Sequence, residues 1–280
     1  MSAILFDIGG TKTRITITKD TDFTVSKFDT PKDPKQFIET IKDTVADLDS
    51  KTKITAIAGG IRGRLNESKT ALRDDSVLKK WLDFPLCEEL TKAISVPAVL
   101  ENDTAVAGLG EAVYGAGKEF DYVVYHTIST GVGGVKIEHG KVDEASLGFE
   151  PGHQILDIDR TVLGEDITPT LENLVSGTAI EERMGVKPYE IDQDDTLWDT
   201  LAGYLGQGLR NSILYWSPEI IVLGGSMIIG DPKILIEDIR KHTVAALDGF
   251  TEAPYITTAK LGDDAGLYGA LALAKQNQYI

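Results

Sequence analysis

Asn102 and Asp103 form a pair of side chains that could activate a hydroxyl group, and they follow a short apolar run at residues 98–100. An amide can hold a hydroxyl group in place, and a neighbouring carboxylate can take its proton. Phosphoryl transfer asks little else of protein side chains, because it depends mainly on positioning and charge neutralisation. Asn-Asp pairs are also common helix caps and turn formers, so spacing alone leaves a catalytic pair and a cap as open alternatives.

Two turns that contain threonine and glycine could bind phosphate groups. Residues 7–12 read Asp-Ile-Gly-Gly-Thr-Lys, and residues 129–134 read Ser-Thr-Gly-Val-Gly-Gly. Glycine has no Cβ, so its backbone can approach phosphate oxygens, and threonine hydroxyls add donors. Taken alone, each turn is equally well explained as a tight hairpin, and neither matches the Walker or dinucleotide-binding pattern. Asp7 can orient water around Mg²⁺ or cap the turn, and its position between strand and glycines favours the site.

Glu150 and His153 lie three residues apart around a glycine, so both can point into one pocket. Paired hydrogen-bonding groups of this kind suit vicinal hydroxyls. A zinc site is the alternative for His153, but the nearby Asp157 and Asp159 are hard oxygen donors and no thiolate is close. We therefore expect no zinc. The other histidines, His126, His139 and His242, are expected to be structural or at the surface.

The sequence around these residues predicts alternating strands and helices. The order strand, Thr/Gly turn, strand occurs twice and is compatible with two halves of similar fold. The strand at residues 98–100 should deliver Asn102 and Asp103 at its carboxyl end, where α/β sheets place ligands. The predicted strands are residues 3–8, 13–18, 54–58, 98–100, 122–125, 135–138 and 219–223, and the predicted helices are residues 34–48, 81–94 and 265–275.

Composition limits the classes of function. The 280 residues are enough for two moderate domains, and the formal net charge of −16 argues against a nucleic-acid partner. An acidic enzyme can still bind ATP through backbone N–H groups and Mg²⁺. No apolar stretch reaches the length of a membrane span, and the N-terminal residues do not resemble a signal peptide. Cys87 is the only cysteine, so no intrachain disulfide can form, and we expect a cytoplasmic protein.

Taken together, these motifs resemble the ROK family of sugar kinases and sugar-responsive repressors, which belongs to the actin-like, hexokinase-like ATPase superfamily. The resemblance covers nearly the whole chain. It implies a two-domain α/β fold of the actin-like, ribonuclease H-like type, with the active site in the interdomain cleft. The small domain would comprise residues 1–108 and 264–280, and the large domain residues 109–263. Members of the family are often dimers, so the resemblance allows a homodimer, although the sequence itself does not fix the oligomeric state.

The resemblance also gives roles to individual residues. Asp103 would be the general base, and Asp7 would act at the Mg²⁺ ion that accompanies ATP. Residues 59–63 resemble the family's glycine loop beside the sugar, residues 218–226 its adenosine loop, and residues 261–270 its C-terminal signature. The implied sugar ligands are Gly60, Asn102, Asp103, Glu150, His153 and Glu172. The implied nucleotide ligands are Asp7, Gly9, Gly10, Thr11, Lys12, Thr130, Gly131, Gly133, Gly224, Gly225 and Ser226.

Two segments depart from the family pattern. The family usually carries a zinc-binding cysteine cluster after the Glu-x-Gly-His motif, and residues 154–171 contain no cysteine. Zinc is therefore not carried over. Residues 75–80 read Asp-Ser-Val-Leu-Lys-Lys where the family favours an Asn-Leu-Pro-Gly pattern, so one contact on the sugar side is expected to be lost or replaced.

The expected function is ATP-dependent phosphorylation of a hexose at its 6-hydroxyl, with glucose as the default sugar. Fructose, mannose or an N-acetylated hexosamine would need changes at only one or two contacts. A sugar-sensing repressor on the same scaffold would carry a DNA-binding domain at its N-terminus, and the first phosphate turn here begins at Asp7, so we expect none. An actin-like ATPase would keep the phosphate turns but would not need Asn102, Asp103 or the Glu-x-Gly-His set.

Overall fold

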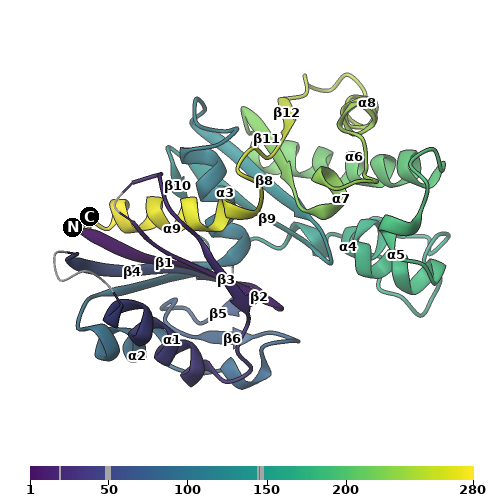
Figure 1. The fold of residues 1–280 in the computed structure, drawn as a ribbon. Helices are drawn as coiled ribbons and strands as arrows, with labels where there is room; N and C mark the ends of the chain where they lie inside the picture. The colour runs from purple at the N-terminus through teal and green to yellow at the C-terminus, as the bar shows by residue number, and fades with distance from the viewer. Residues whose placement is uncertain (19, 48–51, 144, 146–147) are drawn as a thin grey trace. The chain divides into compact units, whose positions relative to one another are not determined.

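The computed structural model describes residues 1–280 except 19, 48–51, 144 and 146–147. Its contacts divide the chain into two units (Figure 1). Unit 1 contains Met1–Tyr114 and Asp263–Ile280, and unit 2 contains Gly115–Asp143 and Phe149–Gly262. The boundary that the sequence placed at residue 108 falls inside one continuous helix, α3, and the contacts divide just after that helix ends.

Unit 1 is built on a five-stranded mixed sheet with the order β3-β2-β1-β4-β7. Strands β1 and β2 form the antiparallel hairpin predicted around the first glycine turn, and β4 and β7 run parallel to β1. A separate two-stranded sheet, β5-β6, follows β4. The strands are β1 (Ser2–Ile8), β2 (Lys12–Thr18), β3 (Ser26–Asp29), β4 (Ile54–Ile61), β5 (Arg64–Leu65), β6 (Leu72–Asp74) and β7 (Ala98–Asn102).

Helices cover both faces of this sheet, as is usual for parallel strands. Side chains alternate between the two faces along a strand. In β1, Ile4, Phe6 and Ile8 therefore pack in the core shared with α1 and α2, whereas Ala3 and Leu5 pack in the core shared with α3 and α9. The C-terminal helix α9 thus lies against strands from the beginning of the chain (Figure 1). The helices are α1 (Pro34–Ala46), α2 (Leu86–Ile94), α3 (Asp103–Val113) and α9 (Ala265–Gln276).

The helix predicted at residues 81–94 is wrong in its first part. Residues Lys79–Trp81 form a short 3₁₀ turn, and α2 begins only at Leu86. Asp83 takes a left-handed conformation with φ of 57°, and Pro85 lacks the N–H that a helix interior needs. The helix predicted at residues 34–48 is present as α1, and its predicted apolar position Leu48 lies outside the described residues.

Unit 2 repeats the sheet of unit 1. Its order β10-β9-β8-β11-β12 again combines an antiparallel three-stranded meander with two strands parallel to the first. The two halves therefore have similar sheets, as the repeated strand-turn-strand pattern suggested. The strands are β8 (Tyr122–Ile128), β9 (Val132–Glu138), β10 (Lys141–Val142), β11 (Ile220–Gly224) and β12 (Tyr255–Thr258).

The main core of unit 2 forms between this sheet and its helices. Val124 and Ile128 of β8 and Ile221 and Leu223 of β11 pack in one cluster with the long helix α6. No helix in the described part of the chain is both long and apolar enough to span a membrane. The helices are α4 (Leu171–Val175), α5 (Gly177–Met184), α6 (Leu197–Trp216), α7 (Ser226–Ile229) and α8 (Ile236–Leu247).

Candidate active site

Asp103 lies where strand β7 ends and helix α3 begins. Asn102 is the N-cap of α3: its Oδ1 accepts a hydrogen bond from Ala105 N at 3.1 Å. Its Nδ2 donates to Gly63 O at 2.9 Å, which ties the glycine loop to the start of the helix. The capping alternative is therefore correct for Asn102. It does not exclude the catalytic one, because the cap uses the side chain of Asn102, and the carboxylate of Asp103 comes one residue later, where its Oδ1 accepts from Thr104 N at 2.7 Å.

The surroundings of Asp103 make its carboxylate a stronger base than an ordinary aspartate. Burial raises its pKa, and the negative charge of Asp75 raises it further. The Thr104 N–H and the positive charge of Arg62 act in the opposite direction without cancelling the effect. Gly60 lies close to Asp103, because a Cβ on Gly60 would be 3.2 Å from Asp103 Cα. The absence of that Cβ leaves the space beside Asp103 open. A raised pKa brings a general base closer to the pH at which it must work.

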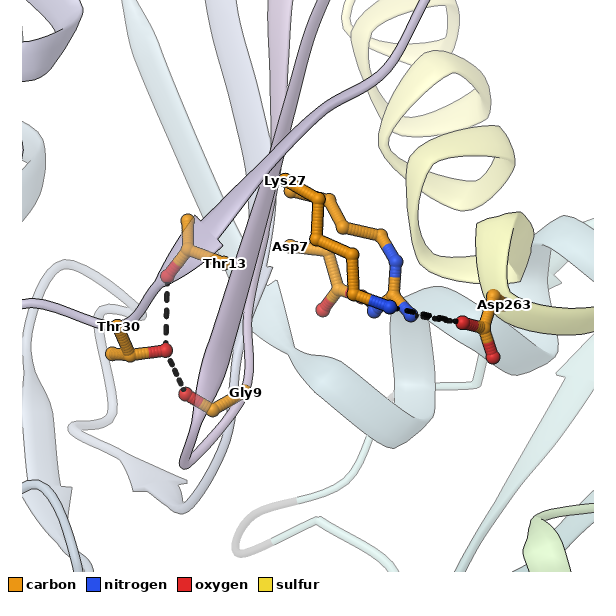
Figure 2. Close-up of polar contacts among 7 residues, drawn as sticks. Asp7, Gly9, Thr13, Lys27, Thr30 and Asp263 are labelled. Carbon is orange, nitrogen blue, oxygen red and sulfur yellow. Dashed lines mark hydrogen bonds and ion pairs between the residues drawn. The ribbon is translucent and has the colours of Figure 1, made fainter.

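Asp7 lies near the carboxyl end of β1, and its side chain is 17% exposed. Burial raises the pKa of Asp7 to about 7, and the charge of Asp103 is the next cause. Arg14 opposes the rise from 3.7 Å, while Asp263 adds to it. Figure 2 shows Asp7 on its strand and Asp263 near the end of the Lys27 side chain. The Asp263 carboxylate also pairs with Arg14. Acidic groups thus gather around Asp7.

A magnesium ion fits this arrangement of carboxylates. Mg²⁺ is usually held by one or two carboxylates together with water and substrate phosphates. Asp7 supplies one such carboxylate, and the acidic neighbours that raise its pKa produce the negative potential that a divalent cation would neutralise. A metal site made entirely of protein side chains is not found in the described part of the chain: no group of three or more His, Cys, Asp or Glu there could hold a metal ion.

The raised pKa of Asp7 predicts a pH-dependent effect on stability. The folded state holds the Asp7 proton up to about pH 7, whereas the unfolded chain loses it near 3.8, so this group's contribution to stability falls as the pH rises through that window. Asp7→Asn removes the cost of the buried charge. At pH 8 the variant should be more stable than the wild type by up to about 4 kcal/mol, and at pH 4 the gain should disappear. Hydrogen exchange of β1 amides at both pH values measures this, and an equal difference at the two pH values would contradict it.

The first glycine turn closes the β1–β2 hairpin tightly. Gly9 N donates to Lys12 O at 3.0 Å, and the Thr30 hydroxyl donates to Gly9 O at 2.8 Å and contacts the Thr13 hydroxyl (Figure 2). Within the described residues, the N–H groups of the next two turn residues, Gly10 and Thr11, make no hydrogen bond, so they are available to a phosphate.

The charge of Lys12, at the end of this turn, is already paired. Its ammonium group pairs with Asp29 on the neighbouring strand β3, and both side chains are exposed. The predicted contact of Lys12 with nucleotide stays a prediction, and it would require this pair to open. The turn has the geometry of a tight hairpin, which was one of its two alternative interpretations. A hairpin alone does not explain why the N–H groups of Gly10 and Thr11 make no hydrogen bond within the described residues.

The second glycine turn joins β8 to β9 and receives a carboxylate from α4. Val132 N donates to Glu172 Oε2 at 2.8 Å, and a Cβ at Gly131 would come within 2.7 Å of the same oxygen. Gly133 continues into β9 opposite Thr127. Glu172, predicted as a sugar ligand, therefore already binds the turn through one oxygen, and Thr130 is exposed at the tip. The glycine at 131 is what lets the carboxylate approach the backbone.

The predicted adenosine loop meets this second turn. Ser226 at the start of α7 shares a hydrogen bond of 3.0 Å with Ser129 through their hydroxyl groups. Gly225 takes a left-handed φ of 87°, and a Cβ there would lie 2.3 Å from Ile128 O. A Cβ at Gly224 would lie 2.4 Å from the Tyr125 hydroxyl. Both positions therefore require glycine, and they hold β11 and α7 close to the turn.

The Glu-x-Gly-His segment packs beside the start of β9. Residues Pro151–His153 form a short 3₁₀ turn, and Gly152 fits because a Cβ would lie 2.2 Å from Val132 O. Glu150 and His153 flank that buried glycine and are both exposed. Gln154 fixes the segment from behind: its Nε2 donates to Pro151 O at 2.8 Å, and its Oε1 accepts from Asn211 of α6 at 2.6 Å.

A carboxylate organises the segment where the family pattern has its cysteines. Asp157 accepts hydrogen bonds from the backbone of Thr161, Val162 and Leu163, the last at 2.7 Å. These bonds lower the pKa of Asp157, with the Leu163 N–H as the largest cause. The loop that follows His153 is thus folded around an aspartate.

The structure gathers the predicted site residues into two groups, one in each unit. Unit 1 brings Asp103 and Gly60 together with Asp7, and unit 2 brings the second turn together with Glu172 and the predicted adenosine loop. Sequence reasoning assigned no role to four charged residues of unit 1: Arg14, Arg62, Asp75 and Asp263. Three of these lie in or beside segments that the resemblance singled out. Charged residues beside the predicted phosphate and sugar loops are candidates for ligand binding, and this is the feature of the sequence from which they could have been identified.

The duplicated sheets with a glycine turn in each define the class of actin-like, hexokinase-like proteins. The ROK family matches residues 3–277, so the chain belongs to the ROK family. The family's sugar kinases are phosphotransferases, and this protein is an enzyme of that class. A fructokinase of Pediococcus pentosaceus is 30% identical over 206 residues, which cover 70% of each protein. The family assignment and the fold class predicted from the sequence are both confirmed.

Solved structures agree with this assignment. The ROK hexokinase from Thermus thermophilus superimposes with a TM-score of 0.85 at 28% identity, covering 99% of this chain and 100% of that one. A ROK glucokinase from Streptomyces griseus, solved in complex with glucose and AMPPNP, has a TM-score of 0.78 at 25% identity, covering 99% of this chain and 100% of that one.

Proposed function

We propose that the protein transfers the γ-phosphoryl group of ATP to the 6-hydroxyl of a hexose, with Asp103 as the general base. The observation that carries the proposal is the setting of Asp103. Its carboxylate stands at the start of α3, has a raised pKa, and lies in the same unit as Asp7 and the first glycine turn. A base in this setting can take a hydroxyl proton as the oxygen attacks phosphorus.

The other predicted residues would position the two substrates. Asn102 has one amide hydrogen left for a sugar hydroxyl after capping α3 and binding Gly63 O. Glu150 and His153 would bind vicinal hydroxyls, and Glu172 would offer its second oxygen. Mg²⁺ held at Asp7 would neutralise phosphate charge. The residues proposed to bind nucleotide are Gly9, Gly10, Thr11 and Lys12 of the first glycine turn, Thr130, Gly131 and Gly133 of the second, and Gly224, Gly225 and Ser226 of the adenosine loop.

Glucose and fructose are the two hexoses that we propose first as substrates. Glucose is the sugar expected from the sequence, and it is the ligand of the Streptomyces griseus glucokinase. Fructose is supported by the fructokinase that shares 30% identity with this chain. Sugars of this size differ at one or two hydroxyl positions, and a site built to hydrogen-bond a hydroxyl group rejects the analogue that lacks it.

A panel of hexoses tests the proposal. ADP release should be measured with ATP and Mg²⁺ in the presence of glucose, fructose, mannose, N-acetylglucosamine and N-acetylmannosamine. We expect one or two of these sugars to raise the rate by at least about 10²-fold over the rate without sugar. The 6-deoxy analogue of the best sugar is the matched control and should give no stimulation. Equal rates with and without every sugar would contradict a kinase and favour an actin-like ATPase.

A further inference from the structure

Arg62 occupies a fixed position between the first glycine turn and the catalytic base. It follows the last residue of β4, and its N–H donates to Ile8 O at the end of β1 at 2.9 Å. The next residue, Gly63, accepts the hydrogen bond from Asn102 Nδ2. The backbone on either side of Arg62 is therefore held by the strand that leads to the turn and by the cap of the helix that carries Asp103.

A buried carboxylate fixes the side chain of Arg62. Its Nε donates to Asp75 Oδ2 at 2.8 Å, and the Asp75 side chain is only 3% exposed. Asp75 Oδ1 accepts from the backbone of Val77 and Leu78, so this carboxylate is itself held in place. Gly63 makes room for the arrangement with a left-handed φ of 92°, since a Cβ there would lie 2.9 Å from Asp75 Cβ. The guanidinium plane is thus oriented before any ligand binds.

The opposite edge of the guanidinium group faces the predicted phosphate site. A Cβ built on Gly10 would lie 2.6 Å from Arg62 Nη1, so the group rests against the first turn. Its charge also reaches Asp103, whose pKa it lowers. The side chain is 31% exposed, and in the described parts of the chain Nη1 and Nη2 have no hydrogen-bond partner. Two donors are therefore available beside both the turn and the base.

The neighbouring cations are already paired. Lys12 binds Asp29, and Arg14 binds Asp263 and lies near Asp7. Within the described residues of this region, Arg62 differs because its carboxylate partner occupies Nε and leaves the Nη edge open. A planar edge with two N–H groups matches two oxygens of a phosphoryl group better than it matches a neutral sugar hydroxyl.

We propose that Arg62 is a catalytic residue that binds the phosphoryl group while it moves from ATP to the hexose. This inference rests on the proposed function. During the step, the bond from phosphorus to the ADP oxygen breaks, a bond from phosphorus to the sugar oxygen forms, and the hydroxyl proton passes to Asp103. Arg62 stays protonated and donates hydrogen bonds to the equatorial oxygens, which carry the charge of the transition state. Asp75 is the positioning residue that aims the guanidinium group.

The test compares Arg62→Ala with Arg62→Lys and with the control Arg64→Ala. Arg64 lies two residues away, is exposed, and pairs at 3.7 Å with the exposed Asp74. We expect Arg62→Ala to lower kcat by about 10²–10³-fold while the KM values for hexose and ATP change by less than about threefold. Arg62→Lys should recover only part of the rate, since an ammonium group lacks the planar pair of donors. Arg64→Ala should match the wild type.

Free guanidinium ion separates a catalytic role from a structural one. Added at millimolar concentration, it should raise the kcat of Arg62→Ala in a saturable way and leave Arg64→Ala unchanged. A kcat for Arg62→Ala within threefold of the wild type, or a slow variant that guanidinium does not rescue, would overturn the inference while the proposed function stands. A wild type without hexose-dependent turnover would overturn the proposed function and this inference with it.

Discussion

Replacement of Asp103 by asparagine is expected to lower kcat for hexose phosphorylation by about 10²–10⁴-fold, the usual contribution of a general base. The amide cannot take the hydroxyl proton, but its oxygen can still accept the hydrogen bond from Thr104 N that the carboxylate accepts now. The fold and the hexose site should therefore persist. Initial rates of ADP release give kcat, and calorimetric titration with hexose should give a dissociation constant close to that of the wild type.

Asp83→Asn provides the matched control for this substitution. Asp83 is exposed, pairs with Arg73, and takes a left-handed φ of 57°, a conformation that asparagine also tolerates. The same chemical change there should leave the rate and the hexose affinity unaltered. Loss of hexose binding in Asp103→Asn with turnover intact would show that Asp103 is a sugar ligand and not the base.

Gly269→Ala is expected to destabilise unit 1 by about 1–3 kcal/mol, through overpacking between α3 and α9. A Cβ at Gly269 would lie 1.7 Å from Val106 O, and one at Gly110 would lie 2.3 Å from Ala265 O. These are contacts with backbone atoms, so no side chain can turn away to make room. Thermal unfolding followed by circular dichroism should show a melting temperature lower by roughly 5–15 °C.

Gly203→Ala tests whether the effect comes from packing and not from the loss of a helix glycine. Gly203 lies within α6, and the nearest atom to a Cβ there would be His242 Nδ1 at 3.8 Å. Alanine should be neutral or stabilising at this position, because glycine disfavours helix interiors by about 0.5–1 kcal/mol. Equal effects of the two substitutions would contradict the close packing of α3 against α9.

Local patterns were enough to predict the hairpins and most strands. The apolar run at residues 3–8, the glycines at 9 and 10 and the alternation in residues 13–18 predicted β1, its turn and β2, because strand period and turn chemistry are short-range properties. The helix predicted at residues 81–94 is wrong at its start, because the left-handed Asp83 and Pro85 prevent a continuous helix before Leu86. Trp81 is nevertheless a core residue, because its ring contacts Phe37 of α1 in the core of unit 1.

The partners of individual site residues could not be predicted from spacing. Arg62 meets Gly10 and Asp75, which lie 52 residues before it and 13 after it, and only the folded sheet brings them together. Lys12 and Glu172 illustrate the same limit, because residue type predicted a ligand-binding role and the structure gives each an internal partner. Spacing alone leaves a catalytic pair and a cap open at Asn102 and Asp103, and the two amide hydrogen bonds of Asn102 show how it can be a cap and still keep one donor.

The fate of the γ-phosphoryl group tests the central claim most directly. Phosphorus NMR of a reaction containing the wild-type protein, ATP, Mg²⁺ and the best hexose follows ADP, inorganic phosphate and sugar phosphate together. The account predicts one hexose 6-phosphate for each ADP formed, with little inorganic phosphate. Release of inorganic phosphate at the same rate with and without hexose, and no phosphate ester of the sugar, would contradict it.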